Sequence, residues 1–150
     1  MRFFFLCTLF CTLVQPRGFS QQVYSRQTRE RLIPIIIQAE SSGNPNAVSR
    51  DGSRGLFQFT EPTWTWASEQ AFGRALSFDD AFDPVKSRRV AEWFIDWLAR
   101  QIDGHYSDAL MIASYNWGIG NVKRNGYRIP DFLKNHPNKI YREILKGGAA

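Results

Sequence analysis

The segment RERLIPIIIQAESS, residues 29–42, joins a dense apolar run to a polar end and predicts a helix over 29–41. Pro34 lies inside this run, so we expect it either in the first helical turn or at a kink. Residues 42–57 are rich in Gly, Asn, Ser and Pro and predict a long loop. Glu40 therefore stands where an apolar helix runs into a polar loop.

The position of Glu40 favours a carboxyl group with a raised pKa. A carboxylate near a helix C-terminus is on the unfavourable side of the helix dipole. Apolar neighbours also disfavour the charged form, and both effects raise the pKa of an acid. A general acid that works near neutral pH needs this property. The periodicity alone fits equally well an exposed glutamate at a fraying helix end.

Helix start and stop signals continue along the chain and predict a mainly α fold. Further helices are expected over 61–72, from Asp83-Pro84 as N-cap and first residue, from Ser107 as a cap, and from near Pro137. No long alternating pattern competes with these helices, so we expect at most a short β-hairpin near 48–59.

Two loop segments carry residues that suit a sugar ligand. In GSRGLFQ, residues 52–58, two glycines bracket a tight turn and allow close approach of the backbone to a ligand. Gln58 offers one acceptor and two donors for hydroxyl and amide groups. Tyr115 and Asn116 stand where a helix ends before Gly118, and an ordinary helix terminus explains this pattern equally well.

The chain contains five tryptophans, a large number for its length. Trp64, Trp66 and Trp117 adjoin the loop segments and are expected to line a groove, where aromatic faces stack on sugar rings. Trp93 and Trp97 follow the apolar stripe of a helix and are expected to pack in the core.

The N-terminus predicts export. Residues 3–14 form an uncharged, mostly apolar run of 12 residues after Met1-Arg2, with Gly18 and Ser20 before a cleavage site. This pattern predicts a signal peptide over 1–20 and a single domain over 21–150. The mature chain then lacks both cysteines, so we expect no disulfide. No stretch of about 18 apolar residues exists to span a membrane.

The charge and composition of the chain limit the classes of partner that it is expected to bind. Without Arg2 and Arg17 the net charge falls from +5 to +3, which suits an anionic partner such as a cell-wall polymer. The basic residues are scattered and an exported protein rarely meets nucleic acid, so no nucleic-acid partner is predicted. His105 and His136 are isolated, which argues against a metal site.

Three motifs in order resemble the soluble (Slt-type) lytic transglycosylases of the lysozyme-like superfamily. They are ESSGNPNAVS at 40–49, G-x-x-GLFQ at 52–58 and YNWG-x-GNV at 115–122, and the resemblance covers about residues 30–146. The sequence departs from the family where Phe57 replaces the usual Met and Ser114 the usual Ala. Thr60-Glu61 also stands in place of Met-Pro, and the proline is displaced to Pro62.

The resemblance implies a lysozyme-like helical domain with an active-site cleft. It implies non-hydrolytic cleavage of the β-1,4 bond between N-acetylmuramic acid and N-acetylglucosamine in peptidoglycan, with 1,6-anhydro ends and no cofactor. Glu40 would be the catalytic acid and base, supported by Tyr115 and Ser41. Gln58 and Asn116 would bind the glycan.

Two other functions remain open. A hydrolytic muramidase needs a second carboxylate, for which the candidates are Asp51, Glu61, Asp79 and Asp80. An inactive wall-binding or scaffold module of a secretion or pilus apparatus is the other alternative. We expect a monomer in the periplasm or cell envelope whose partner is the glycan strand. A secretion, conjugation or pilus machine is a candidate second partner, and a phage origin is equally compatible.

Overall fold

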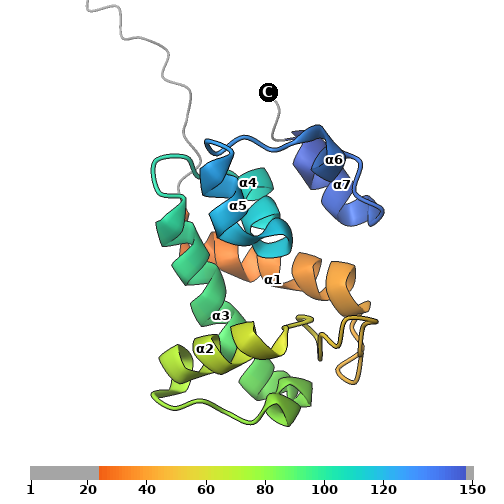
Figure 1. The fold of residues 1–150 in the computed structure, drawn as a ribbon, viewed down its shortest axis with the longest axis vertical. Helices are drawn as coiled ribbons and strands as arrows, with labels where there is room; N and C mark the ends of the chain where they lie inside the picture. The colour runs from red at the N-terminus through yellow and green to blue at the C-terminus, as the bar shows by residue number, and fades with distance from the viewer. Residues whose placement is uncertain (1–23, 148–150) are drawn as a thin grey trace, which may run out of the picture.

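The computed structural model describes residues 24–147, which form helices around one core (Figure 1). This confirms the predicted mainly α fold. The predicted signal peptide over 1–20 lies outside the described residues. Among those that are described, no helix is long and apolar enough to cross a membrane.

The helices are α1 (Arg26–Ser41), α2 (Glu61–Phe72), α3 (Pro84–Gln101), α4 (Asp108–Ala113), α5 (Ile119–Arg124), α6 (Asp131–Lys134) and α7 (Lys139–Gly147), with a 3-10 turn η1 (Phe78–Phe82) and a π-helical turn η2 (Ser114–Gly118).

In place of the hairpin expected near 48–59, the structure has isolated β-bridges. Arg54 pairs with Val48 on one side and with Phe59 on the other, and residues 24–147 contain no strand. Gly52, Gly55 and Gln58 all have positive φ. A turn therefore interrupts this segment every few residues and leaves no extended run that could form a ladder.

Helix α1 begins at Arg26, earlier than predicted, because the Ser25 hydroxyl caps it by accepting a hydrogen bond from the Thr28 backbone N–H. Pro34 does not lie in the first turn. It lies in the helix interior on the exposed side, where it leaves the carbonyl of Glu30 without its usual donor.

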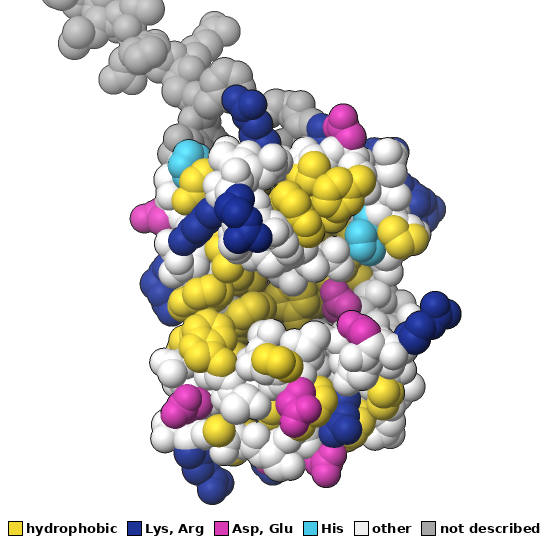
Figure 2. All heavy atoms as spheres, viewed as in Figure 1, with side chains coloured by type: hydrophobic (Ala, Val, Ile, Leu, Met, Phe, Trp, Pro, Cys, Tyr) yellow, Lys and Arg dark blue, Asp and Glu magenta, His cyan; other side chains and the backbone are white. Residues whose placement is uncertain are grey.

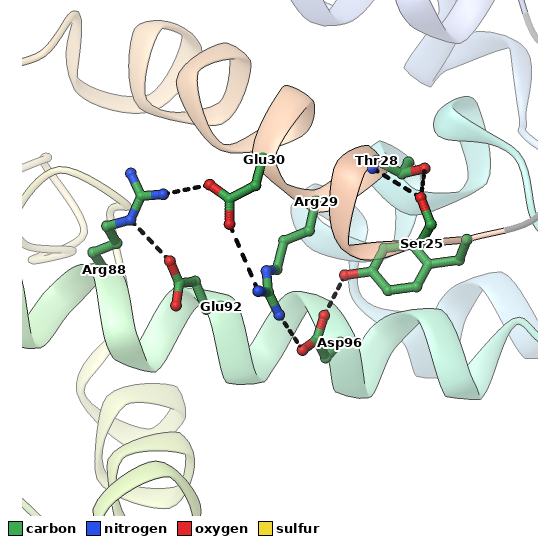
Figure 3. A network of polar contacts seen from close by, with 8 residues as sticks. Ser25, Thr28, Arg29, Glu30, Arg88, Glu92 and Asp96 are labelled. Atoms are coloured by element: carbon green, nitrogen blue, oxygen red, sulfur yellow. Dashed lines mark hydrogen bonds and ion pairs between the residues drawn. The ribbon is translucent and has the colours of Figure 1, made fainter.

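A network of charged side chains joins α1 to α3 (Figure 3). Asp96 on α3 accepts hydrogen bonds from both Arg29 and the Tyr24 hydroxyl. Arg88 donates to Glu30 at 2.6 Å, and Glu30 lies 3.6 Å from Arg29. Such partly exposed pairs contribute little free energy singly, and a connected network of them contributes more.

The core lies where α1, α3, α4 and α7 meet. In α4 every residue after Asp108 is buried, and α4 packs closely against α7. Figure 1 shows α2 and η1 at one end of the molecule and α4 to α7 at the other, with α1 between them. The buried apolar residues come from both ends and include Leu32, Ile36, Phe57, Trp64, Ile95, Leu98, Met111, Ile112, Tyr141 and Leu145.

Gly55 allows the loop after α1 to lie directly against η1. A Cβ added at Gly55 would stand 2.0 Å from the backbone oxygen of Ala81. The close approach expected for this glycine is therefore to the protein's own backbone and not to a ligand. Arg54 reinforces the contact, since its guanidinium lies 4.3 Å from the Phe78 ring centroid and 2.7 Å from Asp79.

Gly55→Ala is expected to lower the free energy of unfolding by about 3 kcal/mol or more, because a positive φ and a backbone clash act together. Gly52→Ala is the matched control, since Gly52 has a similar φ of 84° but nothing within 4 Å of the added Cβ. The control should lose only about 1 kcal/mol. Urea unfolding measures both values, and equal losses would contradict the assigned contact.

Candidate active site

An open cleft of about 480 Å³ lies between the two ends of the molecule. Figure 2 shows hydrophobic side chains along this hollow and acidic side chains at one end of it. Residues from α1, the following loop, α2, α3 and η2 line the cleft, among them Glu40, Asp51, Gln58, Trp66, Phe94, Trp97, Tyr115 and Asn116. No group of three His, Cys, Asp or Glu side chains in residues 24–147 is placed to hold a metal ion.

Glu40 is the half-buried carboxyl group of this cleft. It lies one residue before the end of α1, and Ser42 terminates the helix with a left-handed conformation. Burial is the main cause that raises the pKa of Glu40, and the negative charge of Asp51 raises it further. A hydrogen bond from the Tyr141 hydroxyl, 2.6 Å from Oε1, opposes this shift. The carboxyl group thus stays protonated to a higher pH than an exposed glutamate.

Tyr115 lies near Glu40 but does not hold its carboxylate. The buried Tyr115 hydroxyl donates to the carbonyl oxygen of Phe57 at 2.8 Å. Burial and then the charge of Glu40 raise the pKa of Tyr115. The tyrosine of the third motif therefore ties η2 to the loop below the cleft, and the hydroxyl bonded to Glu40 is that of Tyr141.

Tyr141 is the hydrogen-bond partner of Glu40 that the sequence did not reveal. It lies on α7, and Asn138 just before that helix donates from Nδ2 to the carbonyl of Ala39 at 2.9 Å. These two bonds fasten α7 and the residue before it to the end of α1. The available signal was the spacing of Tyr141 and Leu145, which share a buried helix face, because a buried tyrosine hydroxyl needs a partner.

Ser41, the residue after Glu40, bonds to main-chain carbonyls. Its single hydroxyl hydrogen is shared between the carbonyl of Ile37 at 3.1 Å and that of Leu56 at 2.9 Å. The first bond closes the last turn of α1, and the second ties that turn to the loop. The serine side chain is therefore directed at main-chain atoms.

Gln58 and Asn116 both line the cleft. The Gln58 amide nitrogen is engaged with the carbonyls of Gly55 at 2.9 Å and Ala47 at 3.2 Å. Its amide oxygen is the atom that it can offer to a ligand. Asn116 is exposed at the rim on η2, so its amide is accessible from the cleft.

Asp51 is the second carboxylate of the cleft. The Ser49 hydroxyl donates to it and is the main cause that lowers the pKa of Asp51, while Ser53 Oγ lies 3.4 Å away. The cleft thus pairs an ionised Asp51 with a Glu40 that resists ionisation. The other acidic candidates lie outside the cleft lining: Glu61 is exposed on α2, Asp79 binds Arg54 and Asp80 binds Lys86.

The structure places several tryptophans differently from the prediction, which assigned some to the groove and others to the core. Trp66 lines the cleft as expected, but Trp64 is fully buried and donates from Nε1 to the carbonyl of Ser77 at 2.8 Å. Trp117 lies outside the cleft lining and packs edge-on against Phe132. Trp97, expected in the core, lines the cleft.

Comparison with known proteins agrees with this geometry. The model of the transglycosylase SLT domain matches residues 19–136. The chain belongs to this family. The membership confirms the resemblance to lytic transglycosylases and the lysozyme-like fold. Helix α7, which carries Tyr141, lies beyond the matched part of the SLT domain.

Relatives of this SLT domain include two membrane-bound lytic murein transglycosylases F. The chain is 32% identical to that of Photobacterium profundum over 66% of this chain and 18% of the relative. It is 27% identical to that of Shewanella frigidimarina over 89% of this chain and 26% of the relative. The chain thus spans about a quarter or less of the length of these relatives.

Glu40→Gln is expected to stabilise the SLT domain at neutral pH. The folded pKa of Glu40 lies above its unfolded value, so the folded state binds more protons between the two values. Wild-type stability therefore falls as pH rises through this window, and the glutamine variant lacks that fall. The Tm of the variant should exceed that of wild type at neutral pH, and the gap should close near about pH 3. Parallel Tm profiles would contradict the burial assigned to Glu40.

Tyr141→Phe is expected to move the alkaline limb of the kcat/KM profile to higher pH. The change removes a hydrogen bond that favours the charged form of Glu40, so the pKa of this group should rise further. Loss of orientation should also lower kcat about tenfold or more. Tyr115→Phe is the matched control, because it removes a bond to the Phe57 carbonyl and should leave the alkaline limb in place.

Proposed function

We propose that this chain is a peptidoglycan lytic transglycosylase. It cleaves the β-1,4 bond between N-acetylmuramic acid and N-acetylglucosamine without water and leaves 1,6-anhydro-N-acetylmuramic acid ends. The observation that carries the proposal is Glu40, a half-buried carboxyl group with a raised pKa in an open cleft. Membership of the transglycosylase SLT domain family supports the same reaction.

Glu40 acts twice in this reaction. It first gives its proton to the glycosidic oxygen as the bond from C1 to that oxygen breaks. The carboxylate then takes the proton of the muramoyl C6 hydroxyl as that oxygen bonds to C1, which restores the acid. The N-acetyl group of the substrate stabilises the positive charge, as in other substrate-assisted glycosidases. Tyr141 suits both steps, since its hydroxyl orients the carboxyl group and donates to the anion formed between them.

Asp51 favours one alternative, a muramidase that hydrolyses the same bond. In that reaction water attacks C1, and Asp51 takes the proton of this water while Glu40 protonates the leaving group. Asp51 lines the same cleft as Glu40, which is what this mechanism requires. An inactive scaffold module is less well supported, because such a module has no need of a half-buried acid.

The site of action follows from the substrate. We propose that the chain works in the bacterial cell envelope as a monomer, exported by the signal peptide predicted over 1–20, with the glycan strand as its partner. The names of the relatives, membrane-bound lytic murein transglycosylases F, are consistent with the envelope. A secretion, conjugation or pilus machine is the proposed second partner, because the small domain suits local opening of the wall.

Glu40→Gln is expected to abolish release of dye from labelled peptidoglycan while the protein still folds. Glutamine keeps the shape but cannot donate and recover a proton. General acid–base catalysis contributes about 10²–10⁴-fold, and one group serves both steps here, so the loss should reach or exceed the upper value.

Products of the wild-type chain separate the candidate functions. Muropeptides with 1,6-anhydro ends, one water lighter by mass than hydrolysis products, are expected to dominate the digest. If products with ordinary reducing ends dominate the digest, the chain is a muramidase and not a transglycosylase. Absence of dye release from wild type would favour the scaffold module, and near-normal activity of Glu40→Gln would overturn the catalytic assignment.

A further inference from the structure

Basic residues concentrate in residues 119–147, which form α5, α6 and α7 and which we call the basic end. These residues contain seven Lys and Arg but two Asp and Glu, a net charge of +5. Residues 24–118 contain ten Lys and Arg and twelve Asp and Glu, a net charge of −2. Figure 1 shows the basic end on the side of the molecule opposite α2 and η1. Such a separation of charge indicates a surface for an anionic partner.

The domain itself does not neutralise the positive charge of the basic end. Its two acidic residues already lie beside lysines of their own helices, Asp131 beside Lys134 at 3.0 Å and Glu143 beside Lys139 at 3.9 Å. Within residues 24–147, no other basic residue of this end takes part in an ion pair. The charges of α1 and α3, in contrast, are joined in the network of Figure 3.

An exposed aromatic pair lies beside these charges. Phe132 on α6 is 60% exposed and meets Trp117 of η2 edge-on at 5.5 Å. Asn121 of α5 donates to the Trp117 carbonyl at 2.6 Å and accepts from Arg124 at 2.5 Å, so a positive charge of α5 lies close to the aromatic pair. Figure 2 shows hydrophobic side chains at this end next to a group of Lys and Arg side chains.

Cations next to an exposed aromatic ring indicate the chemistry of the partner. An anionic polymer offers charge but no apolar phase, so it would leave Phe132 in water. A bilayer with anionic lipids offers both, because its headgroup phosphates attract Lys and Arg while the acyl boundary below them accepts an aromatic ring. The long aliphatic stems of Lys and Arg let their charges stay at the phosphates while the ring enters more deeply.

We propose that the basic end docks on the surface of a bilayer that contains anionic phospholipids, with Phe132 at the acyl boundary and Arg124 at the headgroup phosphates. The contact is interfacial and reversible, and it requires no membrane-spanning helix. This inference goes beyond the proposed function, because neither Phe132 nor Arg124 is among the described residues that line the cleft. Binding to lipid and cleavage at Glu40 can therefore be tested separately.

Vesicles of phosphatidylglycerol and phosphatidylcholine in equal amounts are the probe, and sedimentation with the vesicles measures binding. The chain is expected to bind these vesicles but not vesicles of phosphatidylcholine alone, and high salt should weaken the binding. Arg124→Gln should lower the affinity about fivefold, the contribution of one basic side chain near an anionic surface. Phe132→Ser should lower it about tenfold, because the exposed ring no longer leaves water.

The matched controls lie at the opposite end of the molecule. Arg74→Gln removes the same charge from an exposed position after α2, and Val85→Ser removes an apolar side chain that is 79% exposed at the start of α3. Both should bind as wild type does. Phe132→Trp keeps an aromatic ring at the position and should retain the affinity, which separates loss of the ring from loss of the fold.

Several results would overturn the docking surface. They are no binding to the mixed vesicles, equal binding to phosphatidylcholine alone, and equal losses in the controls. Salt-sensitive binding that Phe132→Ser leaves unchanged would also overturn it, because a purely anionic polymer or protein would then suit the basic end better than a bilayer. Glu40→Gln should bind vesicles as wild type does, so failure of the lipid contact and failure of the proposed reaction are distinguishable.

Discussion

Partial burial of the Glu40 carboxyl group is the constraint on which the rest of the site depends. A carboxyl group removed from water needs a hydrogen-bond donor, and here the donor is Tyr141, far along the chain. Helix α7 must therefore pack against the end of α1, and the bond from Asn138 to the Ala39 carbonyl fixes that packing. Apolar burial of Tyr141 and Leu145 stabilises the same contact. Under the proposed function, catalysis at Glu40 and closure of the fold thus depend on the same interactions.

The loop after α1 shows how an irregular backbone can form a firm cleft floor. Three separate parts of the protein hold it: the Ser41 hydroxyl bonds to Leu56, the Tyr115 hydroxyl bonds to Phe57, and Ala81 lies against Gly55. The two hydroxyl bonds satisfy backbone carbonyls that a sheet would otherwise pair. Asp51 and Gln58 are consequently presented to the cleft from a backbone that is fixed on several sides.

Local sequence signals predicted the positions of the helices well. They predicted the contacts between the helices poorly. The N-caps at Asp83 and Ser107 were predicted correctly because a cap depends only on neighbouring residues. The hydrogen-bond partner of Glu40 was not predicted, because a bond to Tyr141 depends on how distant helices pack. Trp64 and Trp66 lie two positions apart on one helix and point about 200° apart, so they could not both face the groove.

Sugar binding and proton donation are physically linked in this cleft under the proposed function. A glycan strand that fills the cleft excludes water from the hollow that contains Glu40. Loss of water disfavours the charged carboxylate, so the bound strand raises the pKa of Glu40 further. By reciprocity, the protonated enzyme binds the strand more tightly than the ionised one. Binding of the strand thus favours the protonation state of Glu40 that the first chemical step requires.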